Sequence, residues 1–295
     1  MRHTKVFLAV AAALWVPAAG ADYDADAYFK TGERYHKQRQ HFQAARYYFQ
    51  ALQRSSDRGQ KNALYANISN SLVSQGMYQS AAYFFLKAIE SHDDRAIRIA
   101  LNGIQPLFEN VGGELFRKYL VKYTREYQYS TEQRDYYYYQ VAHDDFLKNR
   151  PERVIRAVDA VNRSFPSYPS ALFLRGTSNL VLGRVNQGVD DFRLCYDLMG
   201  QSRYRAPFQK DEAKEMRNRC AAGVARAYYQ GRNYEEADRW YDRVEMDSFV
   251  WPQIQYERAW AHVARGDYNR ALGRLVTYKS PGLSWFHESE VEMLR

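Results

Sequence analysis

Residues between Cys220 and Pro281 repeat with a period of 34, and this period constrains the fold more than any other feature of the chain. The repeat is visible in four pairs, each 34 residues apart: Ala225 and Ala259, Tyr234 and Tyr268, Ala237 and Ala271, and Tyr241 and Leu275. Such an interval accommodates two helices and the turns that join them. One helix pair cannot bury its apolar face alone, so the period predicts a stack in which each pair covers its neighbours.

A second interval extends the pattern back to the start of the chain. In five of the predicted pairs a small or β-branched residue of the first helix is followed 12 residues later by another in the second: Gly32 and Ala44, Ser69 and Ala81, Ala142 and Val154, Gly176 and Gly188, Ala225 and Ala237. We expect the two helices of a pair to cross closely at these positions. The predicted repeats lie near 28–54, 62–92, 95–128, 135–166, 169–199, 211–248 and 252–281, and a terminal helix near 284–295 follows them.

The third repeat departs from the pattern because it lacks the small residues at the crossing. We expect one helix over Ala96–Glu109, a break at Gly112-Gly113 and a second helix over Glu114–Tyr127. Two helices around a Gly-Gly turn still make a pair. This repeat is therefore interpreted as a degenerate one.

These spacings and residue types resemble the tetratricopeptide repeat (TPR) family, which has a small residue in the first helix and Ala-x-x-x-aromatic in the second. The resemblance implies an all-α, right-handed superhelical solenoid of about seven helix pairs plus a C-terminal half-repeat. The Gly-Asp-Tyr-x-x-Ala-Leu-Gly turn and Ser280-Pro281 are also similar to envelope TPR proteins of predatory and gliding deltaproteobacteria. That similarity implies a periplasmic part of a large envelope or motility complex.

Residues 1–21 have the pattern of a cleaved secretory signal peptide. Arg2 and Lys5 precede the apolar run Val6–Ala19, and small residues follow it. The run is shorter than the roughly 20 residues that a helix needs to cross a bilayer. We therefore predict that residues 22–295 form a single solenoid in the periplasm, without a transmembrane segment after cleavage.

The chain has two cysteines, Cys195 and Cys220. An even number in an oxidising compartment is compatible with a disulfide. The alignment puts Cys195 in a second helix and Cys220 at the front of the next first helix, and such elements pack together. The alternative is that both are simply small buried core residues.

Charge and composition favour a protein partner over nucleic acid. The formal net charge of +8 includes Arg2 and Lys5, which leaves 8 − 2 = +6 after cleavage, spread over many repeats. Nucleic-acid binders usually gather basic residues on one face. The 26 tyrosines and 15 phenylalanines suit both helix stacking and a peptide groove, so they do not decide between the two.

The sequence predicts no catalytic, metal or cofactor site. His92–Asp94 and His143–Asp145 could suggest metal ligands, but the other histidines do not stand at a ligand spacing. A Gly-x-Ser-x-Gly elbow and a Gly-rich phosphate loop are both absent from the sequence. An enzyme is therefore not expected.

The family resemblance implies a concave groove built mainly by first helices. It places eight residues there: Tyr139, His143, Phe173, Thr177, Arg226, Tyr229, Tyr256 and Trp260. Aromatic rings beside Arg and His suit an extended peptide or acidic groups. The alternative is that some of these rings only pack between helices.

The carboxylate clamp of some family members needs Lys and Asn on successive inner faces, and Phe29, Glu33 and Asn70 do not supply it. Two functions follow. The first is a non-enzymatic envelope scaffold that binds a protein partner or peptide. The second is an accessory factor of cell-wall metabolism that binds peptidoglycan or a wall enzyme.

Overall fold

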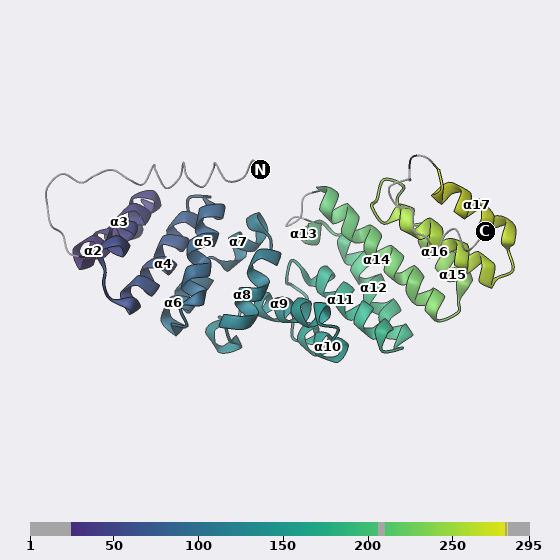
Figure 1. Cartoon of the computed structure of the whole chain (residues 1–295), viewed down its shortest axis with the longest axis horizontal. Helices are drawn as coiled ribbons and strands as arrows, with labels where there is room; N and C mark the ends of the chain where they lie inside the picture. Colours follow the sequence, from purple (N-terminus) through teal and green to yellow (C-terminus); the bar gives the residue numbers. More distant parts are fainter. Residues whose placement is uncertain (1–24, 206–209, 281, 283–295) are drawn as a thin grey trace. The chain divides into compact units, whose positions relative to one another are not determined.

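The computed structural model describes residues 25–205, 210–280 and 282, and every regular element within them is a helix (Figure 1). The predicted all-α fold is confirmed. The helices form two compact units that divide within α9, after Gln140. The predicted signal peptide and terminal helix lie outside the described residues, and the extent of the predicted single solenoid, 22–295, stays a prediction.

Unit 1 begins with two helix pairs, α2 with α3 and α4 with α5, and α3 also packs against α4. Three shorter helices and a 3-10 turn follow. The elements are α2 (Ala25–Lys37), α3 (His41–Arg54), α4 (Arg58–Val73), α5 (Tyr78–Glu90), α6 (Asp94–Leu101), α7 (Ile104–Val111), α8 (Glu114–Tyr123), η1 (Glu126–Gln128) and the start of α9 (Arg134–Leu147).

Unit 2 continues the helix pairs, and each pair contacts the next as expected for a helical solenoid. α11 packs on α12, α12 on α14, α14 on α15, and α16 on α17. The elements that follow α9 are α10 (Pro151–Asp159), α11 (Tyr168–Val181), α12 (Val185–Met199), α13 (Ser202–Arg205), α14 (Lys210–Gln230), α15 (Tyr234–Tyr241), α16 (Trp251–Ala264) and α17 (Tyr268–Tyr278).

The helices of a pair meet where the interval of 12 predicts. The Ser69 hydroxyl on α4 donates a hydrogen bond to the Ala81 carbonyl on α5, at 3.0 Å. A Cβ added to Gly188 on α12 would lie 3.3 Å from the Gly176 carbonyl oxygen on α11. Small residues at these crossings therefore let the two backbones approach, which confirms this part of the prediction.

The turn between the two helices has the same backbone conformation in six of the pairs. The residue two positions before the second helix has a positive φ in each case: Arg39, Gly76, Asn149, Gly183, Arg232 and Gly266. A left-handed residue reverses the chain within a very short turn. The same turn thus recurs in both units although only three of its six residues are glycine.

The third repeat differs from the prediction of one helix over Ala96–Glu109. This segment is broken at Asn102-Gly103 into α6 and α7. In a continuous helix the Ile99 carbonyl would accept from the backbone N–H of Gly103. Here it accepts from the Asn70 side chain at 2.6 Å and from the backbone N–H of Asn102 at 3.2 Å, and the N–H of Gly103 bonds to Ala100. Asn70, on α4, thus takes part in breaking the helix.

The following helix is also shorter than predicted. α8 ends at Tyr123, and Thr124 has an extended backbone. The Thr124 hydroxyl donates to the Leu120 carbonyl and contacts the Tyr129 hydroxyl at 2.8 Å. These bonds satisfy the end of α8, so the chain leaves the helix before Tyr127.

Candidate protein-binding surface on the first helices of unit 2

An ion pair connects two successive first helices of unit 2. Arg226 on α14 donates two hydrogen bonds to Glu257 on α16, at 2.9 and 2.7 Å. The Tyr241 hydroxyl on α15 donates to the same carboxylate at 3.0 Å. This network of Arg226, Glu257 and Tyr241 fixes three helices relative to one another.

Electrostatics keep the network in one protonation state. Burial of the Tyr241 phenol, with the Glu257 carboxylate beside it, raises the Tyr241 pKa far above its usual range. Burial acts to lower the pKa of Arg226, but the hydrogen bonds and charge of Glu257 outweigh it and leave that pKa raised. The phenol therefore remains a donor and the guanidinium remains charged.

Trp260 stands three residues after Glu257, on the same side of α16, and its side chain is 38% exposed. Tyr256, the other predicted aromatic residue of this helix, is 9% exposed and packs against Tyr278 with ring centroids 6.1 Å apart. Trp260 is therefore the aromatic residue that α16 presents at the surface, while Tyr256 packs between α16 and α17.

Three other predicted groove residues contribute mainly to packing. Phe173 meets Phe192 edge to face at 5.4 Å, and the Thr177 hydroxyl donates to the Phe173 carbonyl at 2.9 Å. Tyr229 is half-buried and meets Tyr234 at 5.4 Å. Phe173 and Tyr229 therefore pack between helices, as the alternative interpretation expected, although each side chain keeps some exposed surface.

Tyr139 and His143 lie one turn apart on α9, on either side of the division between the units. Both are partly exposed and both interact with neighbouring groups. Within unit 2, the structure brings together Arg226 and the face that carries Trp260. Tyr139 belongs to the other unit.

Sequence reasoning missed Glu257 and Tyr241, which hold Arg226 in place. The available signal was a pair of opposite charges 31 residues apart on successive first helices. A period of 34 places position 257 close to the level of Arg226 in the next repeat. It does not state which way the two side chains point, so the pair needed the structure.

Cys195 on α12 and Cys220 on α14 form a disulfide, with their Cα atoms 5.9 Å apart. It closes a loop with a sequence separation of 25. A loop of that size stabilises the folded chain by about 3 kcal/mol, chiefly because it restricts the unfolded state. The bond joins the fifth and sixth predicted repeats, and Cys220 lies on α14, the helix that carries Arg226.

The two His-Asp-Asp runs have structural partners. Asp93 caps α6 by accepting from the backbone of Arg95 and Ala96. Asp145 is buried and pairs with Arg150 and Arg153. In the part of the chain that the structure describes, no three His, Cys, Asp or Glu side chains converge as metal ligands.

The same described residues include no helix long and apolar enough to cross a membrane.

No protein-family model matches the chain, and no curated protein is significantly similar to it in sequence. Two solved structures are similar in their helices. A TPR protein from Parabacteroides merdae is 13% identical, over 92% of this chain and 96% of that one, with a TM-score of 0.41. The TPR2AB domain of yeast Sti1, in complex with pHSP90, is 14% identical, over 84% and 98%, with a TM-score of 0.30.

At these scores the two likenesses carry no argument about function. The helix pairs of the chain are TPR-like in their period of 34, in their close crossings at small residues and in their short turns.

Proposed function

We propose that the protein is a non-enzymatic scaffold that binds a protein partner or peptide on the first helices of unit 2. The observation that carries the proposal is Trp260: a large aromatic side chain, 38% exposed, on a helix that the Arg226–Glu257–Tyr241 network holds in place. Tryptophan is among the residues that most often dominate binding energy at protein interfaces.

The mechanism of this scaffold is preorganisation. α14, α15 and α16 are already connected before a partner arrives, so the surface loses little conformational entropy on binding. The ordering cost falls mainly on the partner. An extended peptide or a helix of the partner would cover the indole of Trp260 and bury its apolar area.

We further propose that the scaffold acts in the periplasm as part of a larger envelope or motility complex. Support comes from the signal-peptide pattern of residues 1–21 and from the Cys195–Cys220 disulfide, a bond typical of oxidising compartments. Fractionation of cells that express the native protein tests this location. Recovery of the uncleaved chain in the cytosol would contradict it.

The binding test compares two exposed aromatic residues. Trp260→Ala should weaken capture of a native partner at least about 10-fold, a loss typical of a buried interface tryptophan. Tyr268→Ala is the matched control because Tyr268 is 69% exposed but begins α17, a second helix. Capture is measured by affinity purification from the native envelope fraction with quantification of each retained protein. Equal retention by Trp260→Ala and wild type would reject the proposal.

A second candidate is an accessory factor of cell-wall metabolism that binds peptidoglycan or a wall enzyme. Trp260 also favours this function, because exposed aromatic faces pack against apolar surfaces of ligands. Co-sedimentation with purified murein sacculi separates the candidates. Retention that survives moderate salt and is lost in Trp260→Ala supports wall binding, whereas no retention leaves the protein scaffold.

A further inference from the structure

Three arginines surround two aromatic rings in unit 2. Tyr196 and Arg193 lie on α12 and Trp240 on α15, while Arg217 lies on the first half of α14 and Arg243 in the turn after α15. Arg217 lies over the Tyr196 ring, with its guanidinium carbon 4.3 Å from the ring centroid. Arg243 lies 3.9 Å from the Trp240 centroid, and Arg193 lies 5.8 Å from the same ring. Tyr196 and Trp240 meet edge to face at 5.4 Å. We call these five residues the arginine–aromatic cluster.

The cluster holds positive charge without acidic partners. Arg193, Arg217 and Arg243 form no ion pair with any described residue, whereas Arg175 and Arg258 each bind a carboxylate. The Arg217 Nε is buried and has no hydrogen-bond partner among the described atoms. Among the described residues the charges of the three guanidinium groups are therefore not compensated, which favours an acidic ligand.

Stacking on the rings also prepares the guanidinium groups for a ligand. A guanidinium that lies over an aromatic face keeps the N–H groups at its edge available, and those groups match the two oxygens of a carboxylate. Holding Arg217 and Arg243 against the rings restricts their rotamers before a ligand arrives. Less entropy is then lost on binding.

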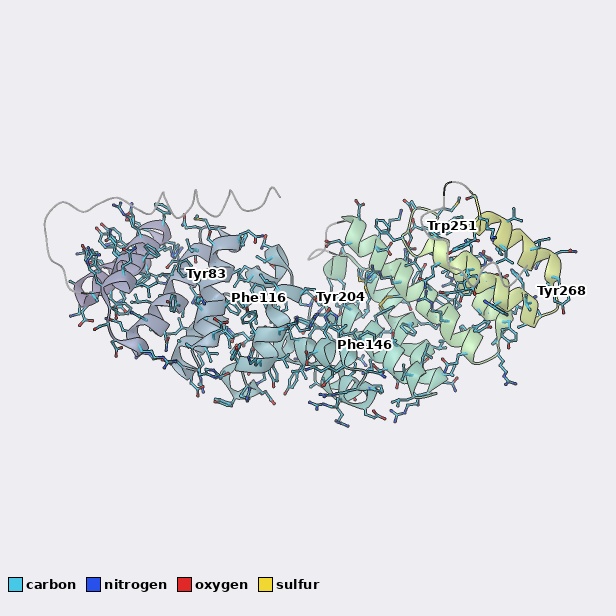
Figure 2. All side chains as sticks on the ribbon, in the orientation of Figure 1. Tyr83, Phe116, Phe146, Tyr204, Trp251 and Tyr268 are labelled. Atoms are coloured by element: carbon cyan, nitrogen blue, oxygen red, sulfur yellow. A yellow bond between two sulfur atoms is a disulfide. The ribbon has the colours of Figure 1, made fainter. Side chains whose placement is uncertain are left out.

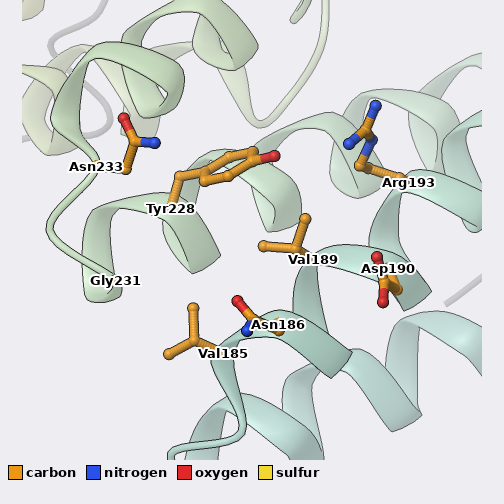
Figure 3. Close-up of a pocket in the computed structure, with 8 residues that line it drawn as sticks. All are labelled: Val185, Asn186, Val189, Asp190, Arg193, Tyr228, Gly231 and Asn233. Atoms are coloured by element: carbon orange, nitrogen blue, oxygen red, sulfur yellow. The ribbon is translucent and has the colours of Figure 1, made fainter.

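A hollow of about 360 Å³ adjoins the cluster, and Arg193 belongs to both (Figure 3). Figure 3 shows the hydroxyl end of Tyr228 directed toward the side of the hollow where Arg193 lies. The lining residues are Val185, Asn186, Val189, Asp190, Arg193, Tyr228, Gly231 and Asn233. Amides, a hydroxyl and short apolar side chains together match a peptide backbone with small side chains.

We propose that the arginine–aromatic cluster and the adjoining hollow bind an acidic peptide segment of a protein partner. Two carboxylates of the segment pair with Arg217 and Arg243, and the chain continues past Arg193 into the hollow. Asp190 favours a peptide over a polyphosphate, because its carboxylate would repel a ligand that is charged along its whole length. This site is separate from the Trp260 surface and does not depend on it.

The probe for the test is a fluorescein-labelled, acetylated peptide of alternating Glu and Gly, and a Gln–Gly peptide of the same length is its control. Binding is measured by fluorescence anisotropy with the full mature chain. The Glu–Gly peptide should bind at least about 10-fold tighter than the Gln–Gly peptide, and its affinity should fall as salt is added. Equal binding of the two peptides would overturn the proposal.

The variant Arg217→Gln/Arg243→Gln should weaken binding of the Glu–Gly peptide at least about 10-fold, because two charge-assisted pairs are lost. The matched control is Arg95→Gln/Arg156→Gln. It removes the same charge from two exposed arginines on helices, and neither of these forms an ion pair with a described residue. It should change the affinity by less than about 2-fold. An equal loss in both variants would mean diffuse attraction and would reject the site.

Three further measurements distinguish the proposed site from the alternatives. If the double variant melts at a lower temperature than wild type, Arg193→Gln replaces it, because Arg193 is exposed, and should weaken binding about 3-fold.

Trp260→Ala should leave the affinity for the peptide unchanged, and a loss there would place the peptide on the other surface. Tripolyphosphate that binds more tightly than the peptide would overturn the choice of an acidic peptide.

Discussion

At the scale of single residues, Glu257 connects more of unit 2 than any of the predicted groove residues. Its carboxylate accepts from Arg226 on α14 and from Tyr241 on α15, while its own helix carries Trp260. The side chains of Arg226 and Glu257 are 35% and 21% exposed, so solvent screens the pair only in part. Glu257 therefore supports the surface that carries Trp260 without having to contact a partner itself.

Glu257→Gln should lower the free energy of unfolding by about 1–2 kcal/mol, because it leaves Arg226 half-buried without its counter-charge. The matched control is Arg239→Gln. Arg239 also bonds to two carboxylates, but its side chain is 64% exposed. The control should cost less than about 0.5 kcal/mol. Urea unfolding of the two variants tests this difference, and equal costs would contradict the role given to Glu257.

His262 should make unit 2 sensitive to mild acid. Its side chain is fully buried, and burial lowers its pKa below the ordinary 6.5, although Asp238, 3.6 Å away, partly opposes this effect. Asp238 is already paired with Arg258 at 2.6 Å. Below the unfolded pKa of 6.5 the unfolded chain binds more protons than the folded chain, so stability falls as the pH drops.

We expect the free energy of unfolding of the wild type to fall by about 1 kcal/mol more than that of His262→Gln when the pH drops by about two units, from about 7.5. Urea unfolding of both proteins at the two pH values measures the change. The loss seen in His262→Gln gives the contribution of the other titrating groups, which is subtracted from the loss seen in the wild type. Parallel losses in both proteins would show that His262 is not the cause.

Residue types at fixed intervals could be predicted from the sequence, whereas contacts between side chains could not. The crossing of Ser69 with Ala81 follows from the interval of 12, because a helix pair must place small residues where its backbones meet. The pairing of Arg226 with Glu257 depends on the rotation of α14 and α16 about their axes. That rotation is set by the packing of Phe192, Ala225 and the neighbouring core.

At the scale of elements, the short turn between the two helices of a pair is the most regular feature. It uses a left-handed residue two positions before the second helix, and its side chain varies from Gly266 to Arg232. In two of the six turns the next residue also supplies a side-chain cap: Asn233 accepts from the backbone of Glu236, and Asp267 accepts from that of Arg270. The other four turns have no such cap, so the feature common to all six is the backbone geometry.

Exchanging the residues at this position should shift stability in opposite directions. Arg232→Gly should raise the free energy of unfolding by about 0.5 kcal/mol, because glycine adopts a positive φ without steric cost. Gly266→Ala should lower it by about 1 kcal/mol for the same reason, and no atom lies within 4 Å of the added Cβ to confuse the result. Thermal unfolding of the pair checks this, and shifts of the same sign would contradict it.

The third repeat shows where prediction of elements fails. The apolar spacing of residues 96–109 is helical throughout, yet the segment contains two helices. Pro106 has no N–H to donate to the Asn102 carbonyl, and Asn70 from α4 donates to the Ile99 carbonyl, so both act at the break. A hydrogen bond from another element cannot be read from local periodicity. The lack of small residues at this repeat indicated an irregular pair, and Pro106 was the sequence signal for a break near Asn102 that the prediction overlooked.

At the scale of the whole molecule, unit 2 carries two separate candidate surfaces. The first helix α16 carries Trp260, and the Arg226–Glu257–Tyr241 network holds that helix in place. The arginine–aromatic cluster is built from α12, the first half of α14 and the end of the α15 region, while α17 exposes apolar residues such as Tyr268 and Leu272. Figure 2 shows Tyr268 on α17, at the edge of unit 2 that this helix forms.

Site-specific photo-crosslinking in cells that make the native partners tests the central claim most directly. A crosslinking amino acid is placed on first helices at the exposed Trp260 or the half-buried Tyr229 and, as controls, on α17 at Tyr268 or Leu272, which are both exposed. The account predicts one discrete protein adduct, of the same mass from positions 229 and 260, and none of that mass from the α17 positions. An adduct that forms equally from α17, or only there, would contradict a binding surface on the first helices.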